Sequence, residues 1–364
     1  MPRKQKTALV APLNWGLGHA SRLLPLIRTL GEMNYEVHIA GSSPANDVIS
    51  QEFPGIRILP LKSATIKYSR NRLLMIKLFF QAPFLLRDLL YERRWIRKYV
   101  KQEKPDLIIS DNRFGLSHPK VMSCYITHQV NVIMPEYLKI FQALARVIHR
   151  SIIKKYDICM IPDFSQNPLS GKLAHNVDGF DFRHIYLGIL SGFFNTQPVV
   201  TDNVPDVLAI VSGQEPQRSM LVEQLMKLFA GDKRNLWIIA GQPEARYDFA
   251  DGNVRVINHL RRAELKYLMQ HTPVLITRSG YTTLMDLHVL QRKAILIPTP
   301  GQTEQEYLAE YFSDTYDFQT IQQKDLADVD YFQPEFCGDW LHTERQNASS
   351  LHEKLSATIR NAMK

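Results

Sequence analysis

Residues 277–286 of the 364-residue chain read TRSGYTTLMD. The apolar run at 274–277 predicts a buried strand, and the pattern of residues 281–290 predicts a helix. A Ser-Gly turn, Ser279-Gly280, therefore stands where a strand ends and a helix begins. Such a helix start presents unpaired N–H groups and a positive dipole end to an anion. Thr282 and Thr283 add hydroxyl and N–H groups, so the stretch predicts a diphosphate site.

A carboxylate follows this turn. Asp286 lies four residues after Thr282, one helical turn on, and therefore shares its face of the helix. A carboxylate in this place can accept hydrogen bonds from both hydroxyls of a ribose. The alternative is a buried aspartate paired within its own helix.

Two further turns carry polar groups of the same kind. Ser212-Gly213 follows an apolar run at 207–212 and precedes a predicted helix, which suits a phosphate. Residues 297–307 read IPTPGQTEQEY, a rigid turn that leads into a polar helix start. There Glu304 and Gln305 offer acceptors and an amide to sugar hydroxyls. The preference for acidic residues in a first helical turn also explains Glu304.

A glycine turn follows the first predicted strand, where residues 14–22 read NWGLGHASR. Gly16 and Gly18 permit a tight turn and a close approach of a ligand to the backbone. A dinucleotide site requires a third glycine where Ser21 stands, and an acidic residue after the second strand, which here runs into Ala-Gly-Ser-Ser. NAD binding is therefore not expected.

His19 stands where this turn becomes a helix, at the carboxyl end of a strand. An imidazole there can act as a general base near neutral pH, unless it is a capping or core histidine. A base works better when a carboxylate orients it, and Asp111 ends the buried strand at 106–110. The carboxyl ends of parallel strands meet at one sheet edge, so His19 and Asp111 are expected to meet. Asp111 can instead be a helix N-cap.

Strands and helices alternate along the whole chain, which predicts an α/β protein with two doubly wound, Rossmann-like domains around a central cleft. The series restarts after a stretch rich in glycine and proline. The expected parts are an N-terminal Rossmann-like domain at 1–187, a linker at 188–205, a C-terminal Rossmann-like domain at 206–346 and a C-terminal helix at 347–364.

The positive charge is local. Residues 67–104 hold 11 Lys and Arg against 3 Asp and Glu, a balance of +8, whereas the rest of the chain holds 33 of each. An even charge elsewhere and no stacking platform of aromatic and basic residues argue against nucleic acid. Apolar residues from Leu73 to Leu86 are interleaved with these cations. The stretch is either a solvated helix face or a surface that contacts anionic membrane.

Cysteine usage and the chain ends point to one compartment. Three scattered cysteines give neither a disulfide framework nor metal-ligand spacing. The apolar run behind the basic N-terminus is short, and Lys77, Gln81 and Pro83 interrupt the stretch at 73–86. We expect a cytoplasmic protein without a metal or cofactor, peripheral at the inner face of the membrane if the basic stretch binds there.

These motifs together resemble the family 28 glycosyltransferases of GT-B fold, which include the lipid-linked N-acetylglucosaminyltransferase of peptidoglycan synthesis. The resemblance covers most of the chain. It rests on the GLGH motif at 16–19, KPDLII at 104–109, THQ at 127–129 with His128 on the acceptor side, and most specifically on residues 278–305. Two departures are Asp286, where the family usually has Glu, and the loop around Trp15, which has fewer glycines; the acceptor is therefore not carried over.

The resemblance implies a nucleotide-sugar donor, with UDP as the expected nucleotide, bound by the C-terminal domain. It assigns the diphosphate to Ser279, Gly280 and Thr282, and the ribose to Asp286. The sugar would contact Glu304 and Gln305, in the matched segment that begins at Gln302, and the base would lie beside Val256 and Ile257. Arg218 is a further phosphate candidate.

The expected reaction transfers the sugar to an acceptor hydroxyl with inversion, with His19 as the base. A nucleotide-sugar hydrolase of the same fold is an alternative, because such enzymes also show Gly-x-Gly-His followed by an Arg, here Arg22. An epimerase is another.

Overall fold

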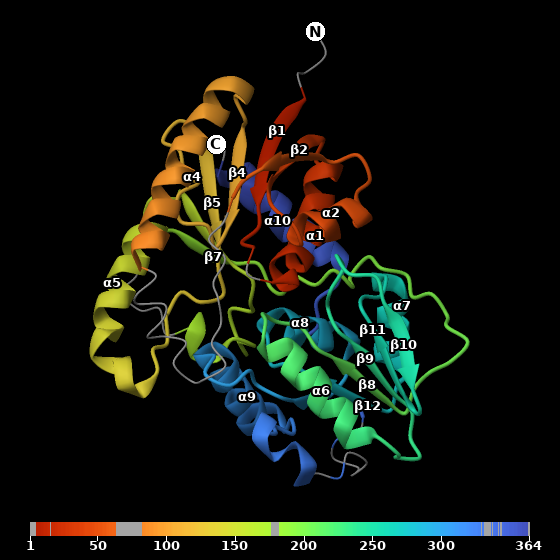
Figure 1. The fold of residues 1–364 in the computed structure, drawn as a ribbon. Coiled ribbons are helices and arrows are strands. Elements are labelled where there is room, and N and C mark those ends of the chain that lie inside the picture. The colour runs from red at the N-terminus through yellow and green to blue at the C-terminus, as the bar shows by residue number, and fades with distance from the viewer. Residues whose placement is uncertain are drawn as a thin grey trace.

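The computed structural model describes residues 5–14, 16–62, 82–175, 182–328, 330, 336, 338–340, 342 and 344–362. The chain forms two parallel sheets, one in each half, with helices on both faces of each (Figure 1). The predicted fold class, two Rossmann-like domains, is confirmed. Among the described residues, no helix is long and apolar enough to cross a membrane.

The first sheet has seven strands, all parallel to their neighbours. Their spatial order is β3 (Arg57–Pro60), β2 (Tyr35–Gly41), β1 (Lys6–Ala11), β4 (Leu107–Asp111), β5 (Met122–Ile126), β6 (Ile158–Ile161) and β7 (His184–Tyr186). The chain builds outward from β1 in one direction and then returns to place β4 on the other side of β1. The order of the strands thus reverses between β1 and β4, where α/β proteins usually bind ligands.

The second sheet has six strands and the same kind of reversal. Its order is β10 (Asp248–Asp251), β11 (Val254–Ile257), β9 (Leu236–Ile239), β8 (Val207–Ile210), β12 (Val274–Thr277) and β13 (Ile295–Leu296). The only antiparallel pairing among these described strands joins β10 to β11. Here the order reverses between β8 and β12, the two strands that lead into the Ser212-Gly213 and Ser279-Gly280 turns.

Alternating residues of each strand pack against different helix layers. In the first sheet, Val10 and Ile109 face the layer of α1 (Leu17–Glu32) and α2 (Ala45–Glu52). Leu9 and Ile108 face α4 (Ala82–Glu103), and α5 (Gln142–Ile153) packs nearby through Ile153.

In the second sheet, α6 (Gln217–Phe229) covers one face, while α7 (Arg262–His271) and α8 (Tyr281–Leu290) cover the other. The apolar cluster that holds α7 and α8 continues into the first half of the chain, so the two halves share one core. The remaining described elements are α9 (Thr303–Tyr316), α10 (Ala348–Ala362) and the short 3-10 helices η1 (Glu136–Phe141), η2 (Gly171–Leu173) and η3 (Gln323–Asp328).

Several elements fall where the sequence predicts them, and others do not. The strand at 274–277 and the helix at 281–290 have the predicted bounds, and the strand expected at 207–212 ends at Ile210. The elements α2, α5, β7 and β10 were not predicted. Residues 63–81 lie outside the described residues, and so does most of the apolar run from Leu73 to Leu86.

The C-terminal helix crosses back to the first half of the chain. Figure 1 shows α10, in blue, beside α1 in the upper half of the molecule, and the two helices are in contact. Leu351, Leu355 and Ile359 are buried in the same cluster as the inner face of α1. The segment before α10 also meets the segment predicted as linker, because the Gln346 amide oxygen accepts from Ile189 N at 2.7 Å.

Replacing Leu355 by Ala should lower the free energy of unfolding by about 2–5 kcal/mol, because it leaves a cavity between α10 and the first half. Urea unfolding followed by circular dichroism measures the change. Glu353→Ala, at an exposed position of the same helix, is the matched control and should leave the midpoint nearly unchanged. Equal midpoints for the two variants would show that α10 does not pack as described.

Candidate active site at the domain junction

The carboxyl ends of β1 and β4 bring together the two groups that the sequence predicts to meet. His19 lies in the first turn of α1, and Asp111 is the last residue of β4. The His19 Nδ1 and Asp111 Oδ2 atoms are 3.0 Å apart. Asp111 is fully buried, and no helix begins in the described residues 112–121, so the alternative of a helix N-cap is wrong.

Arg22 completes this pair, in a role that the sequence did not predict. Its buried guanidinium forms a two-pronged contact with Asp111, from Nε to Oδ2 at 3.1 Å and from Nη2 to Oδ1. Nη2 also lies 2.9 Å from His19 Nδ1, and Nη1 lies 3.0 Å from Nδ1 of His128. The spacing of His19 and Arg22, three residues on one helix, is the signal that could have revealed their contact.

The charges of this cluster shift the pKa values of its members. Burial alone would raise the pKa of Asp111, but Arg22 and His19 outweigh it and lower the pKa to about 2. Asp111 is therefore ionised at neutral pH. Burial and the positive charge of Arg22 lower the pKa of His19, and Asp111 opposes them only in part. His19 is therefore neutral at neutral pH, as a general base must be.

The cluster extends into the second half of the chain through His128, which follows β5. His128 Nε2 lies 2.8 Å from Oε1 of Glu304 in the first turn of α9, and the imidazole stacks on the Tyr281 ring with centroids 4.4 Å apart. Burial would raise the pKa of Glu304, but His128, His19 and Arg22 lower it on balance. The residue predicted to hold the donor sugar thus contacts the acceptor-side residue.

The N-termini of α1 and α8 abut at the same junction. A Cβ atom on Gly18 would stand 2.8 Å from Thr282 Oγ1, so only glycine permits this approach. Each helix start carries a partial positive charge, and two such charges in contact favour an anion beside them. Gly280 is the N-cap of α8, and the Ser279 hydroxyl donates to the Gln305 carbonyl at 2.7 Å. Thr283 is partly exposed in the same turn.

The other predicted phosphate loop lies next to this one, after β8. Gly213 is exposed with φ of 117°, and no atom lies within 4 Å of a Cβ placed on it. Ser212 is partly exposed beside it. Arg218 has protein partners, because it contacts Glu215 Oε1 at 2.6 Å and the Gly241 carbonyl at 3.2 Å.

Asp286 is engaged by the segment that joins the two halves. Ser191 Oγ donates to Asp286 Oδ1 at 2.5 Å. Burial raises the pKa of Asp286 to about 6, although Arg262 and the Ser191 hydrogen bond lower it. The alternative reading, in which Asp286 pairs within its own helix, is therefore wrong. Arg262, which the sequence did not single out, also donates to Ser21 of α1 at 3.2 Å.

The remaining predicted donor residues have mainly structural contacts. The Gln305 amide oxygen accepts from Thr299 N at 2.9 Å, and Gln302 is the N-cap of α9. Val256 and Ile257 lie in β11 with buried side chains.

Arg278 is a buried cation that the sequence did not assign. Its guanidinium donates to the carbonyls of Ile297, Pro298 and Gln217 at 2.9–3.2 Å. Burial lowers the pKa of Arg278 to about 9, so it keeps its charge at neutral pH. It places a positive charge between the starts of α6, α8 and the 297–302 loop.

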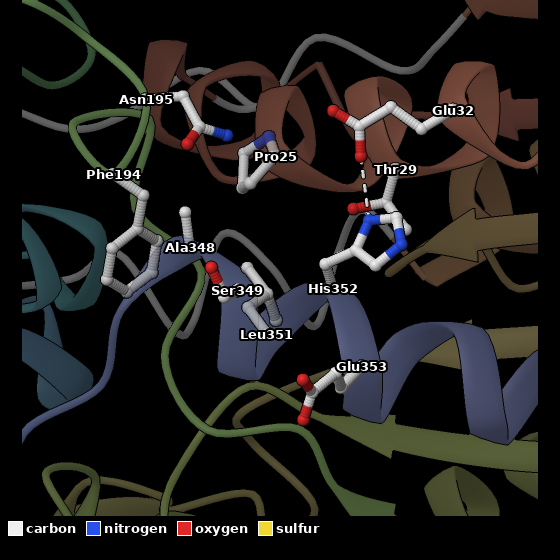
Figure 2. Close-up of a pocket in the computed structure, with 10 residues that line it drawn as sticks. All are labelled: Pro25, Thr29, Glu32, Phe194, Asn195, Ala348, Ser349, Leu351, His352 and Glu353. Atoms are coloured by element: carbon white, nitrogen blue, oxygen red, sulfur yellow. Dashed lines mark ion pairs between the residues drawn. The ribbon is translucent and has the colours of Figure 1, made fainter.

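A cavity of about 320 Å³ lies elsewhere, between α1, residues 194–195 and α10 (Figure 2). An ion pair of 2.7 Å between His352 and Glu32 crosses it. None of the predicted site residues lines this cavity. Among the described residues, no group of three or more His, Cys, Asp or Glu side chains could hold a metal ion.

Comparisons with known proteins agree with this geometry. Residues 244–330 match the model of the glycosyltransferase family 28 C-terminal domain. The structure of the glycotransferase of kitacinnamycin is 15% identical, covers 99% of this chain and 98% of its own, and superposes with a TM-score of 0.61. The chain has the GT-B fold of glycosyltransferases.

Other solved structures share this GT-B fold. Arabidopsis thaliana UGT89C1 complexed with UDP-L-rhamnose is 14% identical, with all of both chains covered and a TM-score of 0.60. SnogD from Streptomyces nogalater is 12% identical over 98% of this GT-B chain and 95% of its own, with a TM-score of 0.59. No curated protein matches the sequence.

The raised pKa of Asp286 predicts how stability changes with pH. Its value in the folded protein, about 6, lies above the ordinary 3.8, so the folded state binds this proton more tightly than the unfolded chain. Raising the pH through this window therefore lowers the free energy of unfolding. Asp286→Asn keeps the acceptor for Ser191 and removes the titration, so the decline from pH 4 to 6.5 should become smaller.

Urea unfolding at several pH values measures this effect. Asp248→Asn is the control and should leave the decline unchanged, because hydrogen bonds from Arg255 lower the pKa of that exposed carboxyl and so keep its titration below this pH window. A decline that is as steep in Asp286→Asn as in the wild type would rule out the titration of Asp286 as its cause.

Proposed function

We propose that the protein transfers a sugar from a UDP-sugar to an acceptor hydroxyl with inversion at the anomeric carbon. The observation that carries the proposal is the neutral His19, oriented by the ionised Asp111, beside the abutting starts of α1 and α8. A base and an anion-binding site within one junction are what displacement of a nucleoside diphosphate requires.

The donor side is built at the reversal point of the second sheet. The Ser212-Gly213 and Ser279-Gly280 turns lie at the adjacent ends of β8 and β12, and both lead into helices. The buried Arg278 adds a positive charge beneath them. UDP is favoured because a protein of the same fold was solved with UDP-L-rhamnose and because the C-terminal domain matches family 28.

Two residues proposed to hold the donor have protein partners that the ligand would replace. Glu304 would exchange His128 for a hydroxyl of the donor sugar, and Asp286 would exchange Ser191 for the ribose hydroxyls. Both exchanges trade one hydrogen bond for another. Their net energy is therefore small, and specificity comes from the geometry of the new bonds.

The chemical step moves one proton and one glycosyl group. His19 Nε2 takes the proton of the acceptor hydroxyl while its Nδ1–H donates to Asp111. The acceptor oxygen forms a bond to the anomeric carbon as the bond from that carbon to the phosphate oxygen breaks. Attack opposite the leaving group inverts the configuration.

The leaving nucleoside diphosphate gains one negative charge, at the oxygen released from the anomeric carbon, and the protein must stabilise it. The starts of α6 and α8 and the cation of Arg278 are the groups proposed for this task. We propose that they act without a metal ion or a cofactor.

His19→Ala should reduce turnover of a UDP-sugar by at least about 100-fold, because a positioned general base typically contributes that much or more. It should still bind UDP, which at a hundred times its dissociation constant stabilises a protein by about 2.7 kcal/mol. Thermal shift measures the second quantity. His184→Ala, an exposed histidine in β7, is the matched control. Full turnover in His19→Ala would refute its assignment as the base.

A hydrolase and an epimerase of the same fold are separated from a transferase by one incubation. The enzyme is mixed with a UDP-sugar without an acceptor, and the products are resolved by chromatography. Rapid release of free sugar would identify a hydrolase, and an isomerised UDP-sugar would identify an epimerase. The transferase proposal expects little product until an acceptor is added.

The acceptor side has a surface suited to lipid, so we also propose that the acceptor is lipid-linked and is met at an anionic membrane. Leu144, Val147 and Ile148 lie on one face of α5 and are 52–61% exposed, and Ile140 just before it is 84% exposed. Exposed Arg146 lies between them in sequence. Such a contiguous apolar surface rarely faces water without a partner.

The basic stretch predicted to face the membrane reaches the same side of the molecule. Its described part is α4, where Leu86 and Leu90 are exposed beside Arg87. Figure 1 shows α4 and α5 along the same flank of the first domain. The proposed contact thus includes α5 in addition to residues 67–104. With the expected cytoplasmic location, the proposal makes the protein peripheral at the inner face of the membrane.

Replacing both Leu144 and Val147 by Glu should weaken binding to anionic vesicles by at least about tenfold, because apolar burial worth more than about 1.4 kcal/mol is lost. Flotation with phosphatidylglycerol vesicles measures the bound fraction. Val200→Glu, an exposed valine outside this flank, is the control and should bind like the wild type. Wild-type protein that stays entirely unbound would remove the membrane proposal.

A further inference from the structure

Arg22 lies at the centre of the junction but is outside the reaction just proposed. It stands one turn after His19 on α1, and only 1% of its surface is exposed. Its guanidinium reaches three different segments, namely its own helix at His19, the end of β4 at Asp111 and the loop after β5 at His128. If Arg22 served only to balance the charge of Asp111, it would not need its contacts with His19 and His128.

The contact with His128 fixes the position of a proton. A guanidinium has five N–H donors and no acceptor. Because Nη1 of Arg22 lies 3.0 Å from His128 Nδ1, that nitrogen accepts and carries no proton. A neutral His128 therefore has its proton on Nε2. This atom lies 2.8 Å from Glu304 Oε1 and donates to it.

The contact between Arg22 and His19 instead affects how many protons the His19 ring carries. His19 Nδ1 lies between Asp111 Oδ2 at 3.0 Å and Arg22 Nη2 at 2.9 Å. Asp111 favours a proton on Nδ1, whereas Arg22 favours a bare nitrogen. A second proton on the ring would set an imidazolium against the guanidinium. Arg22 thus opposes double protonation while Asp111 keeps the ring oriented.

The charged groups that face His19 come from four segments. Arg22 is on its own helix, Asp111 is on β4, His128 follows β5, and Glu304 is on α9. Arg22 and Asp111 form a neutral pair, and Glu304 is held by His128. Burial and the adjacent guanidinium lower the pKa of His19, whereas Asp111 raises it through its charge and its hydrogen bond, and the net direction is downward.

We propose that Arg22 is a positioning residue that sets the protons of both histidines, holding His128 as an Nε2–H donor toward the donor domain and His19 in the neutral form. The role of His19 as the base rests on the proposed function, whereas the proton positions on the two histidines do not. Arg22 thereby links the base in the first domain to the sugar-binding carboxylate in the second.

Nitrogen-15 NMR of the ligand-free protein tests the proton positions directly, with His19→Gln and His128→Gln used to assign the signals. In the wild type, His128 should show a protonated Nε2 and a bare Nδ1 near neutral pH. In Arg22→Met, His128 should become a mixture of both tautomers, and His19 should titrate at higher pH than in the wild type. Arg22→Lys keeps the charge without the fork, so it should restore the His19 titration but not the single His128 tautomer.

Arg28→Met is the matched control, because it removes a guanidinium from the same helix where the residue pairs with Glu52 instead. It should leave both histidines as in the wild type. Dispersed spectra establish that each variant is folded, and if Arg22→Met does not fold, Arg22→Lys alone decides the case through the His128 tautomer. A wild-type His128 with its proton on Nδ1 would overturn the proposal, and so would a folded Arg22→Lys with an unchanged His128 tautomer.

Activity gives an independent readout of the same proposal. In Arg22→Met, kcat/KM at pH 5.5 relative to pH 8 should fall as the His19 titration rises past pH 5.5, by about tenfold for each unit beyond it, because the base is then protonated. A structural defect alone would lower the rate equally at both pH values and would contradict the proposal. NMR changes as expected in a protein without UDP-sugar turnover would overturn the proposed function and leave the role of Arg22 intact.

Discussion

The buried carboxylate of Asp111 is the group on which the junction depends. A fully buried carboxylate without partners would cost more free energy than the folded state of a domain can lose. It therefore requires cationic or N–H partners. Arg22 and His19 supply them from one helix, and this fixes α1 against the end of β4. Breaking such a pair by removing one partner typically costs 3–5 kcal/mol. The same contacts therefore hold the two segments together and orient the His19 ring, whose pKa is lowered by burial and by Arg22.

The second half of the chain holds a different arrangement of buried charge. Arg278 is buried against three backbone carbonyls. Carbonyl oxygens accept hydrogen bonds from a guanidinium but do not cancel its charge, and the starts of α6 and α8 add to it. The buried charge of Asp111 in the first half is thus neutralised by Arg22, whereas the carbonyl partners of Arg278 leave its charge in place. An anionic ligand near these helix starts would compensate that local charge.

Much of this design can be read from local sequence, and the rest depends on contacts across long separations. Apolar runs bounded by Gly, Ser and Asp predict the parallel strands and their ends, and parallel strands dictate that His19 and Asp111 meet. The sequence gives no local signal that His128 meets Glu304, 176 residues away, because that contact requires the two domains to close. The sequence also does not indicate that Asp286 pairs with Ser191, since Ser191 lies in a stretch without periodicity. The helix α5 was not predicted although its apolar residues gather on one face, and the sequence alone does not tell that this face points outward.

The chain passes between the two halves twice. It crosses once through residues 187–205 and once before α10, and Gln346 hydrogen-bonds to Ile189 and to the Leu187 carbonyl where the two crossings meet. If the two halves were to separate, two connections at one place would act mechanically as a single axis. A rotation about that axis would part His128 from Glu304 along an arc, and the reverse rotation would return the two groups to the same register.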